Sequence, residues 1–259
     1  MEEYRLLERI LKERCEIVEA PESPSAGDDD QGEPPVPVKL KAPKEVKSDS
    51  LQTPHDPEVT YSGHKGQGYE VQLSETCQDK DAPQEQKNPV QLITEVKLTP
   101  SAKSDARQTI PMIEALEVAG HKPETMLTDT TYNSAENAAQ AAQHAVDLLA
   151  PCPAKGKPDP QKSYPAPAAH CPKVKEEAAE WIKQQEASPS FKKDYALRSG
   201  IEGTNSEWKR TTGAGRLRVR GGDRVELVVN FKAAALNLKR ALNYWLRPPA
   251  IGEPACVLV

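Results

Sequence analysis

The chain has 259 residues, a formal net charge of -5 and an aromatic content of 5%. The length allows one or two domains, but the few aromatic side chains and the 24 prolines limit the core that it can bury. No apolar run is long enough to span a membrane and the N-terminus lacks a signal-peptide pattern, so we expect a cytoplasmic protein with no membrane partner.

The first 58 residues divide into a helix and a linker. Residues 1–18 carry Leu7, Ile10 and Leu11 at helical spacing, which predicts a short amphipathic helix. Residues 19–58 are acidic and rich in proline, with few large apolar side chains. Such a composition cannot bury enough surface to offset the entropy of ordering, so we predict a disordered linker.

A hairpin and a helix are predicted next. Residues 69–75 alternate apolar and polar side chains, residues 88–99 supply a second strand, and the turn residues between them favour an antiparallel pair. Residues 105–120 then show the i, i+3 spacing of a helix. Gly120 is placed to end this helix as its C-cap.

A short strand over residues 126–129 precedes an alanine-rich helix predicted over 135–149. The order of hairpin, helix, strand and helix favours an α/β fold with one mixed sheet and flanking helices. Asp129 falls at the carboxyl end of its strand, where ligands and metals collect in open α/β sheets. The alternative is that Asp129 caps the turn or the helix after it.

After a proline-rich stretch over 151–172, predicted to be a mobile insert, four polar side chains recur at helical spacing. They are Tyr195, Arg198, Glu202 and Lys209. On one helix they would form a single polar stripe, because Leu197, Ile201 and Trp208 lie on a different face that can pack against the protein. The alternative is a solvated helix on which Arg198 and Glu202 form an i,i+4 ion pair.

Basic residues outnumber acidic ones by more than two to one between Lys192 and Arg247. Arg216, Arg218 and Arg220 alternate with apolar residues and are candidates for contacts with the DNA backbone. The helix predicted over 225–246 carries an apolar stripe that we expect to face the core. Its members are Val228, Phe231, Ala235, Leu238, Leu242 and Trp245. Residues 248–259 are predicted to be a tail.

The spacing Y-x2-R-x3-E-x6-K resembles the signature around the last catalytic acid of the DDE transposases of bacterial insertion sequences. YSGHKGQGYEVQLSETC, QLITEVKLTPSAKSD, LTDTTYNSAEN and GRLRVRG also resemble stretches of that family, in the same order. The resemblance implies a ribonuclease H-like domain over residues 59–247 that acts on transposon ends and target DNA in the bacterial nucleoid. It also implies that Asp129 and Glu202 are the second and third acids, and that Tyr195, Arg198 and Lys209 contact DNA or orient the site.

Carboxylates of this kind hold Mg²⁺ or Mn²⁺, and two such ions can activate the attacking oxygen and stabilise the leaving oxygen at phosphorus. No strand that could carry the family's first acid is evident before residue 60. We therefore expect an incomplete sheet and a C-terminal portion of a transposase, acting with a missing N-terminal half or as a homo-oligomer. The alternatives are a DNA-binding remnant without catalysis and a metal-dependent nuclease of the same fold.

Overall fold

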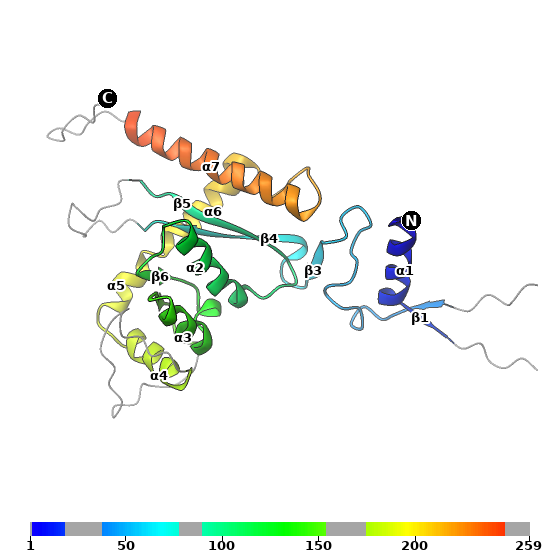
Figure 1. The fold of residues 1–259 in the computed structure, drawn as a ribbon, viewed down its shortest axis with the longest axis horizontal. Coiled ribbons are helices and arrows are strands. Elements are labelled where there is room, and N and C mark those ends of the chain that lie inside the picture. Colours follow the sequence, from blue (N-terminus) through cyan, green and yellow to red (C-terminus); the bar gives the residue numbers. More distant parts are fainter. Residues whose placement is uncertain (1, 19–37, 78–89, 154–174, 247–259) are drawn as a thin grey trace, which may run out of the picture. The chain divides into compact units, whose positions relative to one another are not determined.

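A computed structural model describes residues 2–18, 38–77, 90–153 and 175–246 of the chain. The chain divides into two compact units. The first comprises residues 1–70, 99–102 and 219–224, and the second comprises residues 71–98, 103–218 and 225–259. Figure 1 shows the elements of both units. None of the described helices is long and apolar enough to cross a membrane.

The first unit begins with helix α1 (Glu2–Arg14), which runs into strand β1 (Cys15–Ile17). Strand β1 pairs antiparallel with β2 (Val38–Leu40). The helix is therefore shorter than predicted. Residues 19–37 of the predicted linker lie outside the described residues, whereas residues 38–58 contain β2 and the buried Leu51. Carbonyl groups of Asp49 and Pro57 accept hydrogen bonds from the Arg9 guanidinium and hold this segment to α1.

Strand β3 (Thr60–Ser62) pairs antiparallel with the beginning of β4 (Gly66–Glu75). The buried carboxylate of Asp56 accepts hydrogen bonds from the Tyr69 hydroxyl at 2.7 Å and the Gly221 N–H at 2.8 Å. Burial and the neighbouring carboxylates of Asp56 and Glu58 raise the pKa of Tyr69. Glu58 accepts from the Gly222 N–H, so two acids lie at the first turn of α7 (Gly222–Leu246), where the helix dipole favours negative charge.

The second unit contains the rest of β4 and most of β5 (Ile93–Pro100), the strand next to β4 in a three-stranded sheet. Their contacts run in opposite senses, since Thr76 bonds to Leu92 and Ser74 to Thr94, as predicted for an antiparallel pair. Asn237 of α7 covers the start of β5 by accepting from the Ile93 N–H and donating to the Ile93 carbonyl. An amide side chain thus takes the place of a neighbouring strand at this edge.

The predicted helix over 105–120 is a 3-10 turn, η2 (Asp105–Gln108), followed by α2 (Thr109–Val118). Its end forms a Schellman motif: the Gly120 N–H bonds to the Glu117 carbonyl and the His121 N–H to the Leu116 carbonyl. Gly120 takes a φ of 73°, a left-handed conformation that glycine adopts without steric cost. The predicted role of Gly120 as the residue that ends the helix is confirmed.

Strand β6 (Thr125–Leu127) pairs parallel with β7 (Asp147–Leu149) in a separate two-stranded sheet. The single alanine-rich helix predicted over 135–149 is wrong at its end, because α3 (Ala135–Gln143) stops and β7 follows. Ala145 has a φ of 57°, which breaks the helix and turns the chain back along β6. The described strands form three small sheets, β1-β2, β3-β4-β5 and β6-β7, together with helices, which is consistent with the predicted α/β class. That they belong to one ribonuclease H-like sheet stays a prediction.

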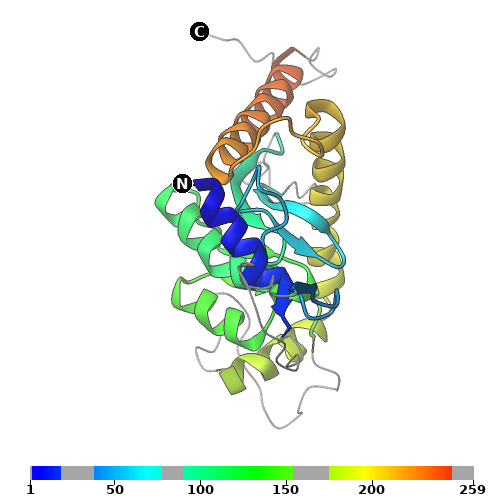
Figure 2. The same ribbon diagram turned by 90° about the vertical axis from the view of Figure 1, so that its right-hand side faces the viewer.

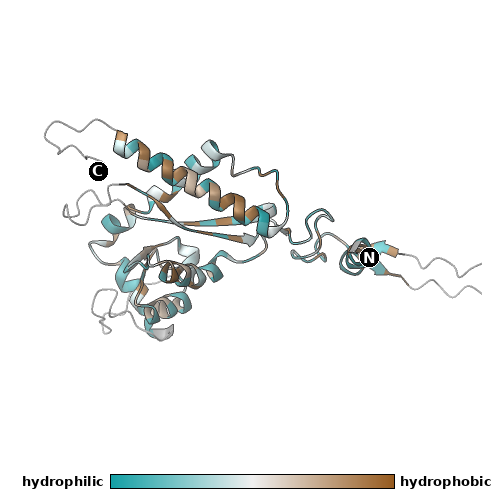
Figure 3. Ribbon diagram, turned by 45° about the horizontal axis from the view of Figure 1, so that its top comes forward, coloured by the Kyte–Doolittle hydropathy of each residue, from teal (hydrophilic) through white to brown (hydrophobic). Residues whose placement is uncertain are grey.

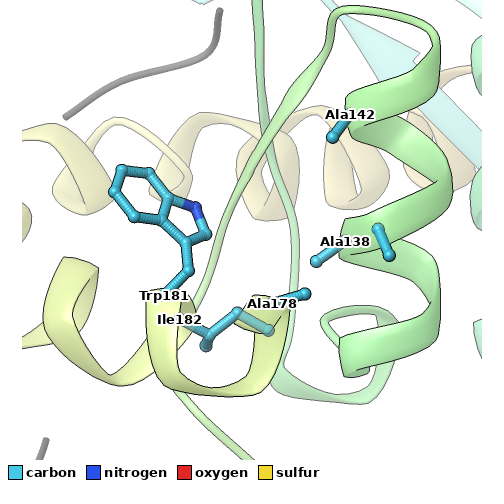
Figure 4. Packing of buried hydrophobic residues seen from close by; sticks show 6 residues of the cluster. Ala138, Ala142, Ala178, Trp181 and Ile182 are labelled. Atoms are coloured by element: carbon cyan, nitrogen blue, oxygen red, sulfur yellow. The ribbon is translucent and has the colours of Figure 1, made fainter. Parts of the chain in front are cut away.

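Helix α4 (Lys175–Glu186), which the sequence analysis did not predict, packs on α3 through small side chains. Figure 4 shows Trp181 and Ile182 of α4 beside Ala138 and Ala142 of α3. Alanine side chains let two helices approach closely, so the large side chains of α4 fill the space between them. Residues 154–174, most of the predicted mobile insert, lie outside the described residues, as does the predicted tail over 248–259.

The remaining helices are α5 (Phe191–Ala196), α6 (Ser199–Thr212) and α7. Thr204 joins α6 to Glu75 of β4, and Asn237 joins α7 to Ile93 of β5. In Figure 2 both helices, in yellow and orange, flank these strands. The prediction that the stripe of Phe231, Leu238 and Trp245 faces the core is wrong, because these three residues are exposed. The buried residues of α7 are Val225, Val229, Ala233 and Leu236.

The buried Asp147 of β7 generates a prediction about stability. Both carboxylate oxygens accept from the Gln185 side-chain N–H, and burial raises the pKa of Asp147 above its ordinary value near 3.8. The Gln185 Oε1 atom is buried with no hydrogen-bond partner among the described residues. In Asp147→Asn, the new amide can donate to this oxygen and carries no buried charge, so we expect the free energy of unfolding at pH 7 to rise by about 1 kcal/mol.

Thermal unfolding of Asp147→Asn followed by circular dichroism measures this gain, with the exposed Asp49→Asn as the matched control. The folded state binds the proton of Asp147 more tightly than the unfolded state, so wild-type stability falls as pH rises above the ordinary pKa. The advantage of the variant should therefore shrink as the pH is lowered from 7 toward the ordinary pKa of Asp147. A variant less stable than wild type at pH 7 would contradict the unfavourable burial of Asp147.

Candidate functional site

Asp129 lies two residues beyond the end of β6, in the loop that leads into the 3-10 turn η3 (Thr130–Tyr132). Its Oδ1 atom accepts a hydrogen bond from the Thr130 N–H at 2.7 Å, so the capping role considered from the sequence is present for one oxygen. The other oxygen, Oδ2, faces the Arg198 guanidinium at 3.5 Å. The side chain is 52% exposed, which leaves it accessible to a ligand.

The four polar residues expected on one helix are divided between two. Tyr195 belongs to α5, Arg198 is the N-cap of α6, and Glu202 and Lys209 lie within α6. Between the helices, the Gly200 N–H bonds to the Leu197 carbonyl and the Ile201 N–H to the Arg198 carbonyl, which are i, i+3 contacts of a 3-10 turn. The expected single continuous helix is therefore wrong, although Leu197 and Arg198 at the junction keep helical backbone angles.

The Arg198 guanidinium joins the two candidate acids. It contacts Asp129 at 3.5 Å and donates a hydrogen bond to Glu202 Oε1 at 3.0 Å. Because the two Nη atoms of a planar guanidinium are about 2.3 Å apart, the contacted carboxylate oxygens lie no more than about 9 Å from each other. The structure thus brings Asp129 and Glu202 to one cation, and the i,i+4 pair considered from the sequence is part of this larger cluster.

The Arg198 guanidinium lies over one of two stacked aromatic rings. The Arg198 guanidinium carbon lies 5.8 Å from the centre of the Tyr195 ring, within the range of a cation–π contact. Tyr195 in turn stacks on the buried Phe191 with ring centres 5.4 Å apart. Partial burial raises the pKa of Tyr195, so the ring remains a neutral phenol at physiological pH. Tyr195 therefore orients Arg198 and its hydroxyl can still donate a hydrogen bond.

The other candidate residues lie outside this cluster. Lys209 is exposed in the last turn of α6, about 10 Å along the helix axis from Glu202. Arg216 and Arg218 are exposed in the segment between α6 and α7, on either side of the half-buried Leu217. Arg220 is also exposed and belongs to the first unit. The structure shows no ion pair for these four residues within the described part of the chain.

A buried polar network holds α6 to the strands, and the sequence analysis missed it. The Glu75 side chain at the end of β4 is 5% exposed and accepts hydrogen bonds from Thr204 of α6 and from Gln91. Arg240 of α7 lies 3.7 Å from Glu75 and donates to the Gln91 carbonyl at 3.0 Å. Burial raises the pKa of Glu75, and Arg240 opposes that change.

The same network extends along α6. Arg240 also donates to Thr204 at 2.7 Å and to Glu207 at 2.9 Å. Gly200 allows the beginning of α6 to approach the network closely, because a Cβ atom there would meet the Gln91 amide nitrogen at 2.5 Å. The packing face of α6 is completed by the buried Trp208. With that face fixed, Glu202 points away from the strands toward Arg198.

The donor chemistry decides what the site could hold. Asp129 and Glu202 offer carboxylate oxygens, which suit Mg²⁺ or Mn²⁺. No group of three or more metal-ligating side chains occurs among the described residues. The single positive charge of the Arg198 guanidinium offsets one of the two carboxylate charges and leaves a net charge of -1. Two carboxylates could serve as ligands of one divalent ion, and by themselves they are too few for a pair of ions.

Comparison with known proteins gives one match. Residues 119–242 match the family model described as the transposase DDE domain. The matched segment contains Asp129, Arg198 and Glu202 and extends from the end of α2 into α7. No curated protein matches the chain, and no solved structure matches it. The match supports a relationship between this segment and the DDE transposases.

The Glu75 network generates a prediction about the placement of α6. Arg240→Ala would leave Glu75 buried without its cation and remove the contacts to Thr204 and Glu207. Breaking such a pair costs about 3 kcal/mol, whereas the exposed pair of Lys239 with Glu207 is worth less than about 1 kcal/mol. Urea unfolding should therefore show a much larger loss of stability for Arg240→Ala than for Lys239→Ala, and equal losses would remove Arg240 from this role.

Proposed function

We propose that the chain is a transposase DDE domain protein that binds DNA and takes part in DNA transposition. The observation that carries the proposal is the contact of one guanidinium, Arg198, with both Asp129 and Glu202. These two acids are far apart in sequence and both lie in the segment that matches the transposase DDE domain. The ribonuclease H-like fold and the Y-x2-R-x3-E-x6-K branch are parts of this proposal.

The residues of the cluster suit phosphate recognition. Arg198 has donors in a planar fork, and a phosphate oxygen can replace a carboxylate oxygen as its partner. The Thr130 N–H holds one oxygen of Asp129, so this carboxylate keeps its position when Arg198 turns toward a ligand. Asp129 and Glu202 would then hold Mg²⁺ or Mn²⁺, and a bound ion would polarise a phosphate oxygen or activate a water molecule.

Among the described residues no third acid joins Asp129 and Glu202. This observation favours the second candidate function, a DNA-binding protein without strand cleavage on its own. We propose that cleavage or strand transfer requires an acid from another chain or from a part of the protein not described by the structure. Cellular activity would take place in the bacterial cytoplasm at the nucleoid, where the DNA substrate is found.

Metal binding can be tested directly. Titration of the full chain with Mn²⁺, followed by calorimetry, should show weak binding that Asp129→Asn and Glu202→Gln each reduce at least five-fold, because each removes one of two charged ligands. Glu177→Gln, an exposed change on α4, is the control. Binding that survives in the double variant Asp129→Asn/Glu202→Gln would place the ion elsewhere and overturn the shared site.

DNA binding is predicted to be sequence-tolerant and to weaken steeply with salt, because the exposed Arg216 and Arg218 offer phosphate contacts. Fluorescence anisotropy with a labelled duplex should show that Arg216→Ala/Arg218→Ala weakens binding. The slope of log K against log salt should also fall by about 1.8. Lys44→Ala/Lys47→Ala, which removes two exposed charges from the first unit, serves as the control. An unchanged slope would exclude both arginines from the interface.

A further inference from the structure

Helix α7 has two apolar faces, and only one of them is buried. Val225, Val229, Ala233 and Leu236 form the buried face. The opposite face is also apolar and consists of Leu227, Phe231, Ala234, Leu238, Ala241 and Trp245, which we call the outer seam. These residues are separated by four, three, four, three and four positions, the spacing of a coiled-coil seam. Figure 3 shows apolar positions in brown along this helix.

The large side chains of the outer seam are open to solvent. Phe231 is 68% exposed, Leu227 and Leu238 are each 58% exposed, and Trp245 is 48% exposed. Leu242, beside the seam, is 42% exposed. Contiguous apolar surface on this scale is uncommon on monomeric proteins and marks an interaction surface.

The electrostatics of α7 exclude a charged partner at the seam. Between Leu227 and Trp245 the charged residues are Lys232, Lys239 and Arg240, and each makes a contact elsewhere. Lys232 donates to the Thr212 carbonyl, while Lys239 and Arg240 contact Glu207 of α6. No charged side chain therefore interrupts the seam, and nucleic acid or an acidic peptide would find no ion-pair partner there.

We propose that the outer seam is a dimer interface on which a second copy of this chain packs its own α7 in the antiparallel direction. Large residues, Phe231, Leu238 and Trp245, occupy every second position, and the positions between them hold Leu227, Ala234 and Ala241. In a parallel pair, large residues would face large ones and alanine would face alanine. In an antiparallel pair, each large residue faces a smaller one, which fills the interface evenly.

The register of this pair follows from the sizes of the side chains. Leu227 faces Trp245, Phe231 faces Ala241 and Ala234 faces Leu238 of the second copy, and the same pairs recur on the other side of the two-fold axis. Such self-complementarity is the requirement of an isologous dimer, in which the same surface of both copies meets. The seam needs no other molecule to be covered.

The available area agrees with a specific but moderate interface. The outer seam extends over about 27 Å of helix, and its exposed side chains with Leu242 and Ala235 present roughly 600 Å². Stable protein interfaces bury about 800 Å² on each partner, and weaker ones somewhat less. We therefore expect a dimer that forms at micromolar concentrations. The association does not depend on DNA, so it goes beyond the function proposed above.

Sedimentation velocity of the full chain without DNA, from 1 to 100 µM, tests the proposal. Wild-type protein is expected to shift from monomer to dimer across this range, and Leu238→Glu should weaken dimerisation at least ten-fold because it buries a charge in the middle of the seam. Since Leu238 is exposed, the circular dichroism melting curve of the variant should match that of wild type. A wild-type monomer at 100 µM, or an unaffected dimer in the variant, would overturn the proposal.

A size exchange tests the partner and the direction. Phe231→Ala should weaken the dimer, and Ala241→Phe should also weaken it by placing two rings opposite each other. The double variant Phe231→Ala/Ala241→Phe should recover most of the wild-type affinity, because each ring again faces an alanine. Absence of recovery would overturn the antiparallel register.

Two further measurements test whether α1 or a membrane surface, in place of a second α7, contacts the outer seam. Helix α1 also carries exposed leucines, Leu7 and Leu11, so Leu7→Glu/Leu11→Glu serves as the control. Dimerisation should be unchanged in this variant. Loss of the dimer in it would assign the contact to α1 and overturn the pairing of two α7 helices. Monomeric protein that sediments with phosphatidylserine vesicles would likewise overturn the proposal in favour of a membrane surface.

Discussion

The buried contact between Glu75 and Arg240 is the interaction on which the arrangement of the second unit depends. A carboxylate at the end of β4 and a guanidinium from α7 are both withdrawn from water, and each needs the other because an unpaired buried charge is costly. Thr204 and Glu207 of α6 form further hydrogen bonds with the pair, as does Gln91. One polar network therefore fixes two helices on the strands at once.

The candidate site follows from this attachment. With Thr204 and Trp208 turned inward, the helical period places Glu202 on the outer side of α6. The 3-10 turn between α5 and α6 then places Arg198 beside Glu202, above the Tyr195 ring. Asp129 arrives from a different direction, after β6, which is aligned by parallel pairing with β7. The two carboxylates lie near each other because both contact the Arg198 guanidinium.

The second unit also shows how small residues organise its layers. Ala138 and Ala142 let α4 lie close to α3, while Ala141 on the other side of α3 packs with Ile113 and Leu148. A helix with so many alanines buries little surface per residue and depends on close contact on both sides. The buried Asn137 adds hydrogen bonds to Ala106, Thr109 and Tyr132, which tie α3 to η2 and η3.

Local patterns in the sequence were sufficient for several features. Alternation identified the strands of β4 and β5, and the glycine at position 120 identified the end of α2, because both depend on neighbouring residues only. The sequence also singled out Asp129, Arg198 and Glu202, which the structure brings together. It did not identify Glu75 or Arg240, because their burial depends on contacts with segments far away in the chain.

What the sequence could not decide is which contacts distant segments make. In α7 two apolar faces have equally good helical spacing, and periodicity alone favoured the one with the larger side chains. The structure buries the other face, because Asn237 and Arg240 must reach Ile93 and Gln91 and thereby set the rotation of the helix. Helical propensity predicted α3 as far as residue 149, but pairing with β6 turned its last residues into β7. The sequence by itself determined the periodicity, the ends of individual elements and the kinds of side chain available for chemistry. Only the tertiary structure decided the buried faces, the strand pairs and the meeting of Asp129 with Glu202, since these depend on hydrogen bonds and packing between residues far apart in the chain.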